Sequence, residues 1–171
     1  AMAIVLGGCG GSGGPDGADT SGSLSVTVLF PPDSSPAQEP KVIPPGTDSV
    51  VVRILEPDTR SELVPDTVIA RPQEDNEARE TIEGVRAGSA LVQALAKPSA
   101  DGSGATLAQA SAQVVVPSGD TVQVGLNLFG VAATVQVRPA TLDVLTTKTA
   151  QLHAVAYDAI GNLIVGAEFA W

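Results

Sequence analysis

The sequence predicts an all-β protein, in which an antiparallel β-sandwich is followed by part of a second sandwich. Short apolar runs alternate with polar residues at the period of two that half-buried strands require. Gly, Pro, Asp and Asn separate these runs at spacings near about 8 to 12 residues, which is typical of sandwiches. Residues 74–80 contain helix formers but no apolar face, so they predict a solvated loop instead of a helix.

The first predicted strand starts at Ser23. Its apolar residues Leu24, Val26, Val28 and Phe30 fall on one side, opposite Ser25 and Thr27. Residues 31–48 contain many prolines, which lack the N–H donor needed in a helix or a central strand, so they predict a long loop. Later strands of this domain are predicted at residues 49–56, 67–71, 79–83, 90–96, 107–116 and 120–129. In the last of these, Val122, Val124, Leu126 and Leu128 are expected to face the same way.

A second unit is predicted from residue 131. Its first strand ends at Arg138 and Pro139, residues 142–149 form a connection, and residues 150–158 form the next strand. The sequence therefore divides into four parts. These are a short apolar start at 1–9, a linker rich in Gly and Ser at 10–22, a sandwich domain at 23–130 and a partial domain at 131–171.

Composition excludes several classes of partner. The chain has 171 residues with 9 Lys and Arg against 19 Asp and Glu, a net charge of -10, and its basic residues are scattered. Such a balance repels phosphate backbones, so no nucleic-acid partner is expected. Only 3% of residues are aromatic, too few for base stacking or for an aromatic sugar platform. A single cysteine excludes an intramolecular disulfide.

The start of the chain carries an apolar run over residues 3–6, then Gly7, Gly8 and Cys9, and then a flexible stretch rich in Gly and Ser. This order resembles a bacterial lipoprotein signal. The resemblance implies that Cys9 is the lipidation site, that the partner of this end is a membrane, and that the protein is exported to the bacterial outer membrane or cell surface. No Lys or Arg precedes Cys9, so we expect the chain to begin inside its signal.

Two further resemblances concern the folded parts. Residues 84–92 and 114–124 resemble the later strands of carboxypeptidase-regulatory-like, or transthyretin-like, β-sandwiches. Residues 137–139, 151–154 and 157–162, with Gly166 and residues 169–171, resemble bacterial Ig-like group 2 domains of the invasin and intimin type. The second resemblance implies an Ig-like sandwich cut near its middle, with Trp171 as an artificial end.

The residues that could carry chemistry point to no catalytic, cofactor or metal site. Cys9 lies on a tether far from His153, and a lone histidine cannot build a zinc site, so we expect His153 to be exposed on a strand. Most carboxylates fall in predicted loops and are expected to be solvated: Glu74, Asp75, Glu77, Asp101, Asp120 and Asp158. Residues 101–104 or 158–162 could supply calcium ligands, but their patterns favour turns.

These expectations favour a non-catalytic structural or adhesive segment in the cell envelope, which acts as a spacer or as a binding module for a protein or glycan ligand. The alternative is a set of accessory modules that belong to an exported enzyme, such as a polysaccharide hydrolase. A third possibility is a binding module that uses the loop at residues 31–48, which is long enough to be functional.

Overall fold

The computed structural model of the protein describes residues 20–30, 43–141, 143 and 148–170. Across these residues the backbone forms strands and no helix. The strands are β1 (Ser21–Leu29), β2 (Ser49–Leu55), β3 (Glu62–Ala70), β4 (Glu77–Arg86), β5 (Gly88–Lys97), β6 (Ala108–Val116), β7 (Thr121–Val124), β8 (Phe129–Gly130), β9 (Thr134–Arg138), β10 (His153–Tyr157) and β11 (Leu163–Ile164).

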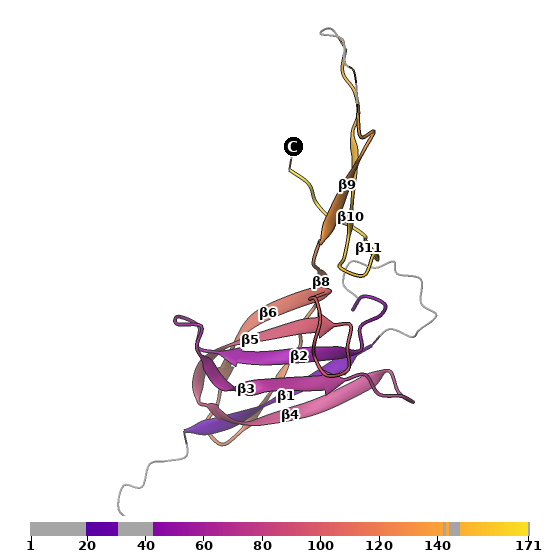
Figure 1. Cartoon of the computed structure of the whole chain (residues 1–171). Coiled ribbons are helices and arrows are strands. Elements are labelled where there is room, and N and C mark those ends of the chain that lie inside the picture. The colour runs from indigo at the N-terminus through magenta and orange to yellow at the C-terminus, as the bar shows by residue number, and fades with distance from the viewer. Residues whose placement is uncertain (1–19, 31–42, 142, 144–147, 171) are drawn as a thin grey trace, which may run out of the picture.

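The strands form two sheets that pack face to face and a third, smaller sheet that projects from one end of this sandwich (Figure 1). The sandwich sheets have the orders β4-β1-β7 and β3-β2-β5-β6-β8, and the third sheet has the order β11-β10-β9. The prediction of an all-β, Ig-like sandwich fold is confirmed. One pairing departs from the antiparallel expectation, because β1 and β7 run parallel with Ser23 beside Thr121.

The core lies between the two sandwich sheets and is aliphatic. Leu24, Val26, Val28 and Phe30 are all buried, so the side of β1 predicted from the alternation is the side that faces the core. Side chains of β5 alternate in the same way. Its buried residues are Ala90, Val92, Ala94 and Ala96, and the residues between them are partly exposed.

β1 and β4 start earlier than the sequence predicts, at residues whose composition is typical of loops. β1 begins at Ser21, so the last residues of the predicted linker belong to the sandwich, and Ser21 pairs with Arg86. β4 begins at Glu77, inside the stretch up to residue 80 that the composition predicts to be a loop, and Glu77 pairs with Leu29. Both errors have one cause. The small residues at the start of β1 and the charged residues at the start of β4 are typical of loops, but here they pair with a neighbouring strand.

The predicted strand at 120–129 is two strands joined by a crossing. β7 pairs with β1 in the smaller sandwich sheet, whereas β8 pairs with Ala108 and Gln109 of β6 in the larger one. Leu126 and Leu128 lie between β7 and β8 and pack on the core, as the alternation predicts. The chain therefore passes from one sheet to the other, and among the described strands only β8 pairs with the outer edge of β6, at Ala108 and Gln109.

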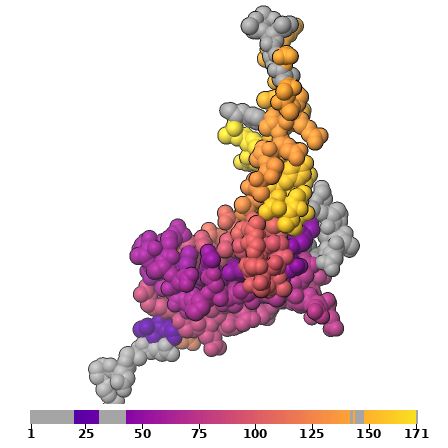
Figure 2. Space-filling model, in the orientation of Figure 1, coloured from indigo at the N-terminus to yellow at the C-terminus, as the bar shows by residue number. Residues whose placement is uncertain are grey.

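The chain enters the sandwich at one end and leaves it at the opposite end. In Figure 1, β1 starts at the end that lies away from β9, β10 and β11, and Figure 2 shows that the third sheet extends the molecule from the other end. No helix in the described part of the chain is long and apolar enough to cross a membrane. Cys9, Trp171 and most of the loop at 31–48 lie outside the described residues.

Candidate functional site

The sequence-predicted candidates that lie among the described residues do not come together in a site. His153 is exposed at the start of β10, where it pairs with Arg138. In the described part of the chain, no three His, Cys, Asp or Glu side chains lie close enough to share a metal ion.

Asp101 forms a tight turn. Its Oδ1 accepts a hydrogen bond from the backbone N–H of Ser103 at 2.9 Å. Hydrogen bonds from the Ser103 side chain and then from its backbone stabilise the ionised carboxylate and lower the pKa of Asp101. The adjacent Gly102 packs over the outer face of the larger sheet, where an added Cβ would lie 2.9 Å from Val51 and 3.1 Å from Val68. The loop at residues 101–104 therefore covers the apolar side chains of Val51 and Val68.

Asp158 contradicts the expectation that it is solvated, because its exposed fraction is only 3%. Its Oδ1 accepts hydrogen bonds from the backbone N–H groups of Ile160 at 3.0 Å and Asn162 at 2.8 Å. Its Oδ2 accepts a third from the side-chain Nδ2 of Asn162 at 3.0 Å. A carboxylate loses little on burial when its oxygens are satisfied in this way. Asp158 therefore fixes the turn between β10 and β11.

This turn rests on the sandwich. The same Nδ2 of Asn162 also donates a hydrogen bond of 2.9 Å to the carbonyl oxygen of Pro45. Beside this bond, Ile160 lies so close to Gly46 that an added Cβ would be 2.8 Å from its Cδ1. We call this group of residues, Asp158, Ile160 and Asn162 against Pro45 and Gly46, the clasp.

The connection between the two units is also held by backbone bonds. The N–H of Val131 donates to the carbonyl of Leu107 in the sandwich at 2.8 Å, and the N–H of Ala133 donates to Tyr157 of β10 at 2.8 Å. Further along, Ile164 of β11 packs on Gly130, where a Cβ would lie 3.2 Å from its Cγ1. The third sheet therefore contacts the sandwich through the connecting segment, through β11 and through the clasp.

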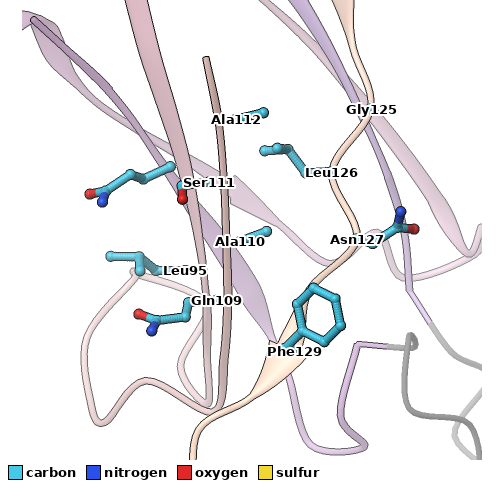
Figure 3. A pocket seen from close by; sticks show the side chains of 10 residues that line it. Leu95, Gln109, Ala110, Ser111, Ala112, Gly125, Leu126, Asn127 and Phe129 are labelled. Carbon is cyan, nitrogen blue, oxygen red and sulfur yellow. The ribbon is translucent and has the colours of Figure 1, made fainter. Parts of the chain in front are cut away.

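A groove of about 570 Å³ lies between the outer edge of β6 and residues 125–129, which lead from β7 to β8 (Figure 3). Its walls carry amide, hydroxyl, small apolar and aromatic side chains and no charged ones. They comprise Gln93, Leu95, Gln109, Ala110, Ser111, Ala112, Gly125, Leu126, Asn127 and Phe129. Phe129 is 57% exposed, so one of the few aromatic rings of the chain stands at the rim of this groove.

The fold and these contacts define an all-β sandwich protein with a smaller sheet docked at one end. No protein-family model, no curated protein and no solved structure matches the chain.

The turn at 158–162 was predicted from its sequence pattern, and the structure confirms it. Sequence reasoning missed the groove and the contact that joins this turn to the sandwich. That contact has no local signal, because Asn162 and Pro45 are 117 positions apart.

Proposed function

We propose that this chain is a non-catalytic structural segment of an exported, lipid-anchored bacterial surface protein, in which the sandwich is a stiff spacer. The observation that carries the proposal is the end-to-end arrangement. The chain enters at the start of β1 and continues into the third sheet from the opposite end (Figure 1). A module with this path adds its own length to the distance between the segments at its two ends.

The clasp supports this role because a spacer must resist bending at its joints. A linker alone leaves neighbouring domains free to reorient, since small interfaces between domains permit relative motion. Here Asn162 bridges the units with one amide nitrogen, which bonds both to Asp158 and to the carbonyl of Pro45. The buried Asp158 in turn holds the turn in the shape that presents Ile160 and Asn162 to the sandwich.

The sequence resemblances support the remaining parts of the proposal. Residues 131–171 resemble bacterial Ig-like group 2 domains, which occur in surface proteins as tandem sandwiches. The first domain resembles transthyretin-like sandwiches, which agrees with a series of sandwich domains in a surface protein. Cys9 is then the lipid attachment point, and the residues after it link the lipid to the sandwich.

Replacing Asn162 by Ala is expected to loosen the joint without unfolding either unit. The variant loses the bond to Pro45 and one of the three bonds to Asp158, whereas the two backbone bonds that shape the turn remain. Backbone ¹⁵N relaxation should give one tumbling time for both units in the wild type. In Asn162→Ala the residues of β9, β10 and β11 should show a shorter tumbling time than the sandwich.

Asn127→Ala is the matched control, because it removes an asparagine side chain from the groove instead of the joint. It should tumble as the wild type does. Two different tumbling times in the wild type, or a single one in Asn162→Ala, would show that the clasp does not stiffen the joint and would remove the main support for a spacer.

The lipid anchor has its own test, which is fractionation of bacteria that express the complete reading frame. Cys9→Ser removes the thiol that would be acylated, so the protein should move from the membrane fraction to the soluble exported fraction. Ser12→Ala, three positions along the same stretch, should leave the distribution unchanged. If Cys9→Ser stays as membrane-bound as the wild type, the protein is not anchored through this cysteine.

A further inference from the structure

β6 has an open edge. It pairs with β5 along its whole length, from Gly88 beside Val116 to Ala96 beside Ala108. On its other side the register with β8 covers only Ala108 and Gln109. In an antiparallel ladder the N–H and C=O groups of alternate residues point away from the first partner. Among the described strands none pairs with this side of β6 from residue 110 onward, so its outward backbone groups are available to another strand.

This edge lacks the protection that the other long edge strands of the sandwich carry. Natural edges are usually guarded by charges, by proline or by bulges, which prevent pairing with another chain. β3, the opposite edge of the same sheet, contains Pro65 and pairs with β2 through register shifts. β4, an edge of the smaller sheet, carries charges along its length. β6 contains no charged residue and no proline, and its register with β5 is unbroken.

The groove lies where an added strand would run. Figure 3 shows Gln109 and Ser111 on one side of β6 and Ala110 and Ala112 on the other, pointing toward Leu126. A cavity lined by both faces of one strand must lie at the edge of that strand, because successive side chains point to opposite faces. The small alanines leave room beside Leu126 for larger side chains of an incoming strand.

We propose that β6 pairs antiparallel with β6 of a second copy of this chain, on a two-fold axis at Gln113. The open stretch from Ala110 to Val116 is centred on this residue. On the core-facing side the pairing places Ala110 opposite the second copy's Val116 and Ala112 opposite its Val114, so a small residue always meets a larger one. On the outer side the two Gln113 amides meet, and Val115, 71% exposed in the single chain, lies opposite Ser111.

The charge of the chain favours a second copy as the occupant. With a net charge of -10, two copies repel each other wherever acidic surfaces meet. From Gly102 to Val137 the sequence contains a single charged residue, Asp120. The edge of β6 lies within this stretch, so its own side chains add no charge that would oppose the approach of a second copy. A two-fold axis also requires a patch that is complementary to itself, which the two alanines followed by two valines on the core-facing side provide.

The test uses two opposite charges at the axis. Gln113→Lys and Gln113→Glu each place two like charges directly opposite one another in the dimer, which destabilises cross-strand pairs. Sedimentation velocity of the full chain, in reducing buffer and from micromolar to millimolar concentration, should show a concentration-dependent dimer for the wild type. The dimer affinity of each variant alone should be at least about tenfold weaker than that of the wild type. An equimolar mixture of the two variants should restore the dimer.

Thr81→Lys and Thr81→Glu are the matched controls, because Thr81 is an exposed residue of β4, the edge strand of the other sheet. They should dimerise as the wild type does. Gln113 is itself exposed, and its side-chain amide donates to the hydroxyl of Ser89 at 2.8 Å on the surface, so circular dichroism should show that its variants fold. A wild type that stays monomeric throughout, Gln113 variants that dimerise as strongly as the wild type, or a mixture that fails to restore the dimer would each overturn the proposal.

Discussion

Replacing Leu24 by Ala is expected to lower the free energy of unfolding of the sandwich by about 3 kcal/mol, which lies within the range for buried leucines. Leu24 is fully buried in β1, and β1 is the central strand of its sheet, with β4 on one side and β7 on the other. Since both neighbours hold the backbone in place, the walls of the resulting cavity cannot collapse. Urea denaturation followed by circular dichroism should show this loss, and the melting temperature should fall by about 10 °C.

Leu29→Ala provides the comparison within the same strand. Leu29 is 66% exposed, so truncating it removes little buried area, and the free energy of unfolding should change by less than about 0.5 kcal/mol. Equal losses in the two variants would mean that β1 does not present Leu24 to the core.

Much of the fold can be predicted from the sequence because the alternation of a strand is local. Leu24 and Val26 are apolar, their neighbours Ser25 and Thr27 are polar, and the pleat alone then decides which side chains face the core. The same holds for Leu126 and Leu128, which reach the core although the chain between β7 and β8 forms no ladder. The side that these two leucines face was therefore predicted correctly, although the single strand predicted at 120–129 was not.

Pairing between strands could not be predicted in the same way. The parallel register of β1 with β7 joins residues almost a hundred positions apart, and no local pattern encodes it. β3 was predicted to start at residue 67 because Pro65 interrupts the pattern, yet the strand begins at Glu62. As β3 is an edge strand, the missing N–H of proline costs no ladder bond when it points outward.

The clasp shows the same limit at the candidate site. A carboxylate in a predicted loop looks solvated, and most of the acidic residues of the chain fit that description. Asp158 differs because its own turn donates hydrogen bonds to it from Ile160 and Asn162, and this turn also docks on Pro45 and Gly46 in the other unit. A contact between segments so far apart has no trace in the sequence around Asp158.

Gly22, the last residue of the predicted linker, lies in β1, and replacing it by Ala is expected to destabilise the sandwich by about 3 kcal/mol. An added Cβ would collide with the carbonyl oxygen of Pro117 and would lie 2.9 Å from both the carbonyl oxygen of Asp120 and Cγ1 of Val116. Backbone atoms cannot rotate away as a side chain does. The start of β1 must therefore separate from the turn between β6 and β7.

Gly125→Ala is the matched control, since nothing lies within 4 Å of a Cβ at that position. Its free energy of unfolding should stay within about 0.5 kcal/mol of the wild type or rise slightly, because alanine restricts the unfolded chain more than glycine does. Urea denaturation gives both values. Hydrogen exchange should also show faster exchange in Gly22→Ala at the N–H of Gly119, which donates to the carbonyl of Ser21 at 2.9 Å. If Gly22→Ala were as stable as Gly125→Ala, residue 22 would belong to a free linker, and the sandwich would begin at Ser23 as the alternation alone predicts.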